Sequence, residues 1–68
     1  MKENLREIAI EMLNIMIERI KTVAEAGEPH SDIPTFRAAG ANFMLYFLDI
    51  LTFEEQEEFD RKIFHPFD

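Results

Sequence analysis

The stretch Arg37–Leu51, "RAAGANFMLYFLDIL", holds almost no charge, although the 68-residue chain has a net charge of −7. Such a segment is typical of a membrane span, the wall of a ligand cage or a helix buried against other protein. Residues 38–51 are too few to cross a bilayer, which takes about 20 predominantly apolar residues, and they include Asn42 and Asp49. We therefore expect a core helix that is apolar nearly all the way round and packs against other protein.

The chain is small for the apolar surface that it carries. Its 68 residues, 47% of them hydrophobic, predict one helical domain over residues 1–68. A domain of this size buries only about 60% of its unfolded surface, and such domains are usually reinforced by disulfides, a metal or oligomerisation. The sequence has no cysteine and two histidines. Oligomerisation is therefore the expected route, although a well-packed helical monomer stays open.

Start and stop signals divide the chain into three helices, and no strand pattern is present. The first helix is predicted over 3–26, with Gly27 as the C′ residue that ends it. The loop "GEPHSDIP" separates it from a second helix predicted over 34–51. Thr52 and Glu55 form a T-x-x-E capping box that begins the third helix. The fold class is therefore all-α, a compact three-helix unit.

The C-terminal sequence "FHPFD" follows the third helix. Pro66 is expected to end that helix, and Phe64 and Phe67 flank it on an acidic part of the chain. We expect these two rings to fold back onto the core, with docking on a partner as the alternative.

The first helix carries more apolar surface than one packing stripe needs. On an ideal wheel its apolar residues spread over roughly 220°, whereas a surface helix needs a stripe of about 100° or somewhat more. Ile10, Ile17 and Ala24 mark one flank, and Ile8 and Ile15 mark the opposite flank. One flank can pack on the chain's own second helix, so the other requires a further surface. Between them runs a packing line at the 4-3-4-3 spacing of Ala9, Leu13, Met16, Ile20 and Val23.

The first two helices carry more apolar surface than a chain of this size can bury. They therefore predict a homo-oligomeric helical bundle, most simply a two-fold dimer. Gly40 lies within the second helix, where a glycine costs roughly 1 kcal/mol relative to alanine, so it indicates a tight helix crossing or room for a ligand. The residues predicted to form the oligomer interface are Ile10, Ile17, Ile20, Gly40, Phe43 and Phe47.

Acidic residues gather on the polar arc of the first helix, within roughly 40° of one another on the wheel. This arc is interpreted as a solvated face or as a negative ridge that meets a basic partner. With 14 acids against 7 bases, the chain is not expected to bind nucleic acid directly or to dock on anionic membranes. The candidate binding residues are Glu7, Glu11, Glu18 and Glu25 of the first helix, with Glu54 and Glu58 of the third.

A second hypothesis is a pocket for a small anionic or nucleotide-like ligand between copies of the second helix. Arg37 near that helix's N-terminus, with His30 and Asn42, would hold the ligand, and Tyr46 would form part of the wall. Each residue also has a simpler reading, such as capping, ion pairing or edge packing.

The sequence contains no known catalytic motif, metal-binding spacing or phosphate-binding loop, and we expect no catalysis, metal or cofactor. Compact regulators and inhibitors, including phage-encoded ones, often combine this size and charge. We therefore expect an interaction protein that binds and modulates another macromolecule. Its expected partners are further copies of itself and a basic protein. The N-terminal "MKENLREIAIEM" shows no signal-peptide pattern, which favours a cytoplasmic location.

Overall fold

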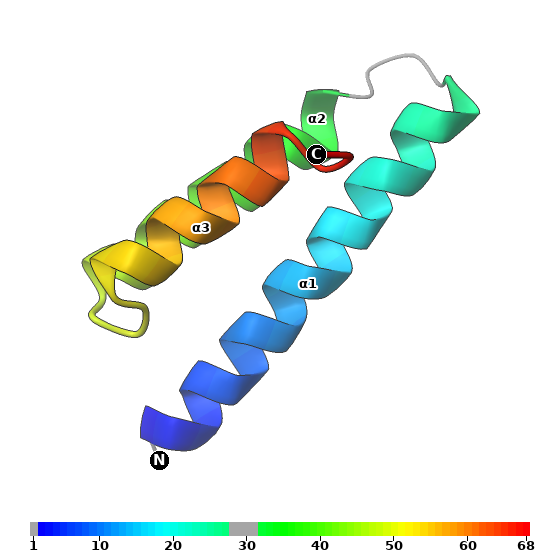
Figure 1. Ribbon diagram of the computed structural model, residues 1–68. Coiled ribbons are helices and arrows are strands. Elements are labelled where there is room, and N and C mark those ends of the chain that lie inside the picture. The colour runs from blue at the N-terminus through cyan, green and yellow to red at the C-terminus, as the bar shows by residue number, and fades with distance from the viewer. Residues whose placement is uncertain (1, 28–31) are drawn as a thin grey trace.

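The computed structural model describes residues 2–27 and 32–68, and these residues form three helices (Figure 1). Helix α1 spans Lys2–Ala26, α2 spans Asp32–Phe47 and α3 spans Phe53–Phe64. The described ranges contain no strand. The prediction of an all-α, three-helix chain is confirmed.

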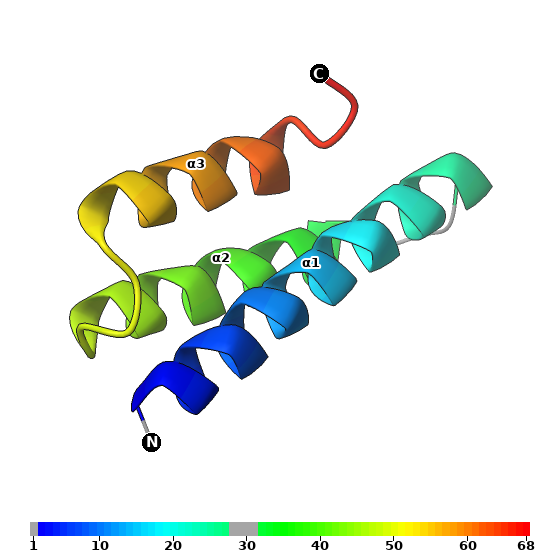
Figure 2. The same cartoon turned by 60° about the horizontal axis from the view of Figure 1, so that its bottom comes forward.

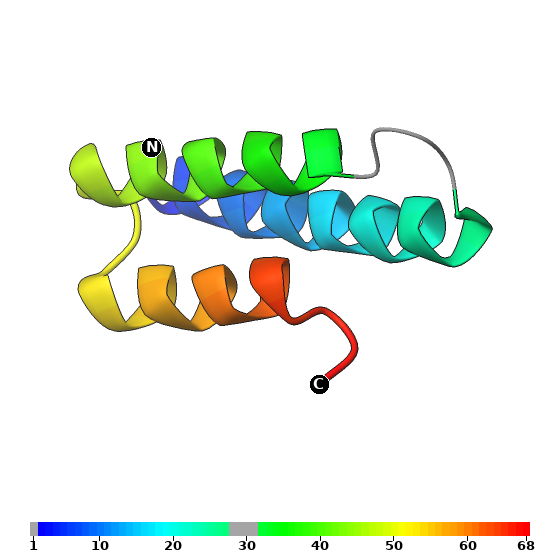
Figure 3. The same cartoon turned by 90° about the horizontal axis from the view of Figure 1, so that it is seen from above.

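The three helices run up, down and up, so that each is antiparallel to the one before it (Figure 2). Helix α2 packs against both neighbours, whereas α1 and α3 meet over a shorter stretch. Seen from above, α2 and α3 form two rows, and α1 runs behind them (Figure 3). The result is an elongated bundle of 38 × 18 × 18 Å.

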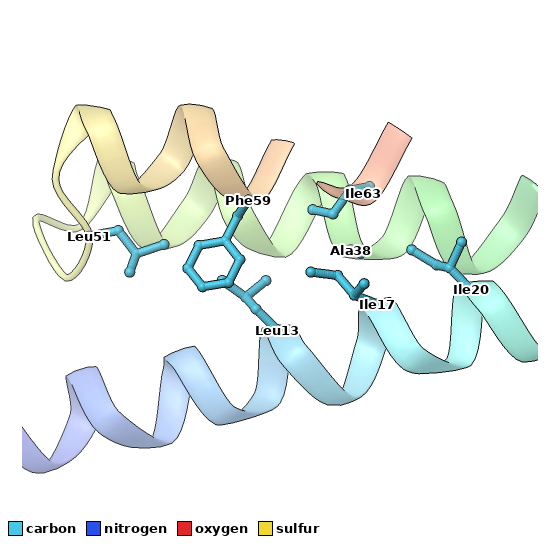
Figure 4. Close-up of a cluster of buried hydrophobic side chains, with 7 residues drawn as sticks. All are labelled: Leu13, Ile17, Ile20, Ala38, Leu51, Phe59 and Ile63. Carbon is cyan, nitrogen blue, oxygen red and sulfur yellow. The ribbon is translucent and has the colours of Figure 1, made fainter. Parts of the chain in front are cut away.

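The core is a row of apolar side chains between the three helices (Figure 4). Leu13 and Phe59 meet near its middle, and Ile17 of α1 lies opposite Ile63 of α3. Leu13 and Ala38 are fully buried. The predicted packing line of α1 is thus used inside the chain, and truncating a side chain such as Leu13 to alanine would cost about 2–5 kcal/mol.

The ends of α1 and α2 show how the local sequence stops a helix. Gly27 takes a left-handed conformation with φ 65°, as predicted for a C′ residue. Helix α2 instead ends at Phe47, so the prediction that it continues to residue 51 is wrong. Asp49 adopts φ 61°, and the N–H of Ile50 donates to the carbonyl of Leu45 at 2.9 Å, which is a Schellman motif. The stop was missed because aspartate, rather than glycine, occupies the left-handed position.

Helix α3 begins at the capping box that the sequence predicts. The Glu55 N–H donates to the Thr52 hydroxyl at 3.2 Å, and the Thr52 N–H donates to the Glu55 carboxylate at 2.9 Å. Acidic residues occupy the first turn, and Arg61 and Lys62 occupy the last, as the helix dipole favours. The C-cap is His65, directly before Pro66.

An ion pair joins α1 to α3 at the same capping box. The Arg6 guanidinium donates to both carboxylate oxygens of Glu55 and, at 3.3 Å, to the carbonyl of Ile50. These contacts hold the pKa of Glu55 at about 2, first through the hydrogen bonds from Arg6 and then through the Thr52 N–H. The Glu55 carboxylate therefore links the start of α1 to both the α2–α3 turn and the start of α3.

A buried amide joins α2 to α3. The Asn42 side chain is fully buried, and its Nδ2 donates to the carbonyl of Gln56 at 2.9 Å. Its Oδ1 has no hydrogen-bond partner among the described residues. Asn42 thus serves as an interhelical hydrogen-bond donor rather than as a solvent-facing residue.

The C-terminal rings do not fold back. Phe64 is 47% exposed and Phe67 is 62% exposed, so the fold-back expected from "FHPFD" is wrong for the single chain. The core cluster is already closed at this end by Ile63, which is 1% exposed. Within the described residues, no helix has both the length and the apolar character that a membrane crossing requires.

Replacing Asp49 with glycine should raise stability, because glycine adopts a positive φ without steric cost. We expect Asp49→Gly to increase the free energy of unfolding by roughly 0.5–1 kcal/mol in urea titrations. Asp49→Ala is the matched control and should be less stable than the glycine variant. Equal stabilities of the two variants would contradict the strain at this position.

Acid should weaken the Arg6–Glu55 link. Because the pKa of Glu55 is lower in the folded chain, at about 2 against 4.5, its contribution to stability is full above pH 4.5 and is lost as the pH falls towards 2. Glu55→Gln keeps a residue that can complete the capping box but removes the charge. The difference in unfolding free energy between wild type and this variant should shrink from pH 6 to pH 2. Parallel pH profiles would refute this role for Glu55.

Candidate functional site

Four exposed apolar side chains follow one line along α1. Their exposed fractions are large: Leu5 55%, Ile8 62%, Met12 39% and Ile15 62%. Their 3-4-3 spacing places them in one row along a helix, in the manner of a coiled-coil seam. The sequence predicted that one flank of this helix would need a further surface, and the structure leaves the Ile8–Ile15 flank uncovered.

A second exposed apolar row follows α2. Phe36, Phe43 and Phe47 are 63%, 57% and 71% exposed, and the last two rings stack with centroids 6.3 Å apart. Within the single chain only the opposite face of α2 reaches the core, so the row is left uncovered, and the expectation that further protein covers this helix stays a prediction. The whole row has 3-4-3-4 spacing and consists of Ile33, Phe36, Gly40, Phe43 and Phe47.

Exposed apolar side chains connect the α1 row to the α2 row, which lies on the outer face of α2. On α1, Arg6 reaches α3, and the exposed row lies on the flank that faces away from Arg6. On α2, Asn42 reaches α3, whereas exposed Met44 and Leu48 lie on the flank towards α1. We call the combined surface the apolar face, and it consists of Leu5, Ile8, Met12, Ile15, Ile33, Phe36, Gly40, Phe43, Met44, Phe47 and Leu48.

The apolar face is large for a chain of this size. At roughly 200 Å² for each aromatic side chain, Phe36, Phe43 and Phe47 alone leave about 400 Å² exposed. Typical monomers have a largest apolar patch of about 300–600 Å², so the remaining residues of the face bring it to the upper end of that range or beyond it. Exposed apolar patches of this size are typical of surfaces that contact another protein, a ligand or a membrane.

The acidic ridge, defined as Glu7, Glu11, Glu18 and Glu25, lies on a different part of α1. All four side chains are exposed, and on a helical wheel they lie roughly 100° from the exposed apolar row. The Lys21 ammonium lies 3.5 Å from the Glu18 carboxylate. A shallow depression along the ridge is lined only by α1 residues, so it is an open groove on the helix surface and not an enclosed cavity.

The acidic candidates of α3 are also exposed. Glu54 lies in the first turn, and the Glu58 carboxylate lies 3.6 Å from the Lys62 ammonium. Arg6 and Glu55 join α3 to α1 on the flank away from the apolar row. On α1, however, the acidic ridge adjoins the apolar face, because Ile15 lines the same shallow depression as Glu11 and Glu18.

The residues predicted to form the oligomer interface divide into two groups. Ile17 and Ile20 are 5% and 3% exposed and belong to the core of the single chain, and Ile10 packs against that core. They are thus covered by this chain's own helices, because α3 lies over that flank of α1. Gly40, Phe43 and Phe47 are exposed and form part of the apolar face.

The structure does not bring the ligand candidates together. His30 lies outside the described residues. Arg37 is exposed, Asn42 is buried against α3, and Tyr46 packs edge-on against Phe53 with centroids 5.9 Å apart. Asn42 and Tyr46, four residues apart, both face α3, whereas Arg37 lies on another side of α2. Over the described ranges there is also no group of three residues that could hold a metal ion.

Two features were not predicted from the sequence. Leu5 and Met12 belong to the apolar arc of the first helix, but their place in one row with Ile8 and Ile15, which the 3-4-3 spacing could have revealed, was not recognised. The Arg6–Glu55 pair carries no local signal, because the two residues are 49 positions apart in the chain.

Comparison with known proteins does not supply a function. No protein-family model, curated protein or solved structure shows significant similarity to this chain. The acidic ridge and the apolar face are therefore the features of this chain that bear on its function.

Proposed function

We propose that this chain is a non-enzymatic interaction protein, a small homo-oligomer that binds a basic protein partner and modulates it by covering part of its surface. The observation that supports this proposal is that the acidic ridge and the apolar face occupy different, adjoining flanks of α1. The two surfaces suit different kinds of contact. The apolar face suits self-association, and the acidic ridge suits an unlike partner.

The physical chemistry of the two surfaces supports this division. Apolar side chains associate by excluding water, and burying an unpaired carboxylate among them would be costly. An exposed cluster of carboxylates instead attracts a basic surface over a distance of about one Debye length, roughly 8 Å at physiological salt. Exposed pairs such as Glu18–Lys21 are worth little, typically below about 1 kcal/mol, so they do not withdraw the ridge from a partner.

The small-ligand hypothesis has less support. It needs Arg37, Asn42 and Tyr46 to converge on one ligand. In the single chain, Asn42 donates a hydrogen bond to the Gln56 carbonyl and Tyr46 packs against Phe53. The two functions can be told apart by the ultraviolet spectrum of the purified protein. Excess absorbance near 260 nm would indicate a bound nucleotide, because the chain has one tyrosine and no tryptophan.

Reversing charge on the ridge tests the proposed function. A partner is first captured on the wild-type protein, identified by mass spectrometry and purified. Its dissociation constant is then measured by calorimetry. We expect the double variant Glu11→Lys/Glu18→Lys to weaken binding at least 100-fold without unfolding the protein, because it places two positive charges against a basic surface.

The matched control is Glu57→Lys/Asp68→Lys, which makes the same change in net charge at exposed positions outside the ridge. This control should bind the partner within about threefold of wild type once salt is held at a physiological level. If both double variants weakened partner binding equally, the effect would come from net charge alone and the ridge would not be the binding site. Unchanged binding by the ridge variant would rule out the ridge.

A further inference from the structure

We propose that a second copy of this chain covers the apolar face, in an antiparallel two-fold dimer whose axis passes close to Gly40. The inference deepens the self-association part of the proposed function, because it names the contact and its geometry. It rests on four observations: the environment of Gly40, the spacing of the α2 row, the exposed area and the distribution of charge.

Gly40 has no role within the single chain that requires a glycine. It is exposed, it lies inside α2, and a Cβ atom added there would meet nothing within 4 Å. A glycine in a helix interior costs roughly 1 kcal/mol relative to alanine. The neighbouring Ala38 is different, because it is fully buried against the chain's own core. A helix that approaches α2 from outside would account for the missing side chain at position 40.

The two ends of the α2 row lie symmetrically about Gly40. Ile33 and Phe47 lie at equal sequence distances on either side, and Phe36 and Phe43 lie about one turn away, four residues before and three residues after it. In an antiparallel pair of α2 helices, Ile33 of one copy would therefore meet Phe47 of the other. The 3-4-3-4 spacing keeps these side chains on one seam, as knobs-into-holes packing requires. Gly40 would lie at the centre, where the two backbones come closest.

The exposed area of the chain matches what a dimer needs. Its accessible surface is 5120 Å². A compact monomer of 8.0 kDa would expose about 4,450 Å² by the usual scaling of surface with mass. The difference, about 670 Å², is close to the roughly 800 Å² that each partner buries in a standard interface.

The charges favour a second copy at this face. Two chains that each carry a net charge of −7 repel each other, so a surface without acidic residues is the most favourable place for them to associate. The residues of the apolar face include no acid, and α2 itself carries only Asp32 and Arg37 as charged residues. A basic partner would instead be drawn to the acidic ridge.

Cysteine cross-linking tests this geometry directly, because the chain contains no cysteine. Wild-type protein is first examined by light scattering, which should give the mass of a dimer. Gly40→Cys should then form an intermolecular disulfide under mild oxidation, since a disulfide needs Cα atoms about 4.4–6.8 Å apart. The control is Asn14→Cys, an exposed position on the acidic flank of α1, which should cross-link at least tenfold less.

Orientation is tested with a mixture of two further variants. Ile33→Cys and Phe47→Cys should cross-link to each other when mixed, and each should cross-link poorly to itself. A parallel dimer would reverse this result. Gly40→Leu should raise the dissociation constant of the dimer at least 100-fold, whereas Asn14→Leu should leave it unchanged, with helicity of both variants confirmed by circular dichroism.

The proposal would be overturned by a wild-type protein that is monomeric at all concentrations. It would also be overturned if the Gly40→Cys and Asn14→Cys variants cross-linked equally, or if the mixed pair failed to form the heterodimer. These results concern only the apolar face. Binding of a basic partner by the ridge is measured with different variants, so either conclusion can fail while the other stands.

Discussion

The packing of α2 against both α1 and α3 determines most of what this chain can bury. Ala9 on α1 is 5% exposed and Ala38 on α2 is fully buried, and small side chains such as these allow neighbouring helices to pack closely. Leu13, Ile17 and Ile20 then reach past α2 to the side chains of α3. A bundle closed in this way covers one stripe of each helix. The bundle cannot bury the outer rows of α1 and α2, whichever residues they contain.

Polar contacts hold the third helix to this pair. The Arg6–Glu55 ion pair and the Thr52 capping box share one carboxylate, so the start of α1, the α2–α3 turn and the start of α3 are joined at a single point. Only the Asn42 amide connects α2 to α3 by a side-chain hydrogen bond in the described part of the chain. The helices are therefore held together by an ion pair and hydrogen bonds at the end of the bundle near Arg6, whereas apolar packing holds them together in the middle.

Local signals in the sequence predicted the fold well where the residue type itself sets the backbone. Gly27 and the Thr52–Glu55 box marked two helix boundaries correctly, because a left-handed glycine and a capping hydroxyl act within a few residues. Asp49 was missed, since aspartate adopts the left-handed conformation less often. The location of each flank was harder to predict. Helical periodicity shows that α1 has two apolar flanks, but only the position of α3 decides that Ile17 is covered and Ile15 is not.

The buried Asn42 amide has a consequence for how α3 can sit on α2. If α3 slid along α2 by half a helical turn or rotated about its own axis, the Nδ2 group would lose the Gln56 carbonyl, leaving a buried donor without a partner. Such an unsatisfied group costs about 1–3 kcal/mol, a large share of the stability of a domain this small. Apolar contacts between two helices tolerate several registers, and one buried polar group can select among them. Asn42 therefore favours a unique alignment of α2 and α3 over the alternative alignments that hydrophobic packing alone would permit.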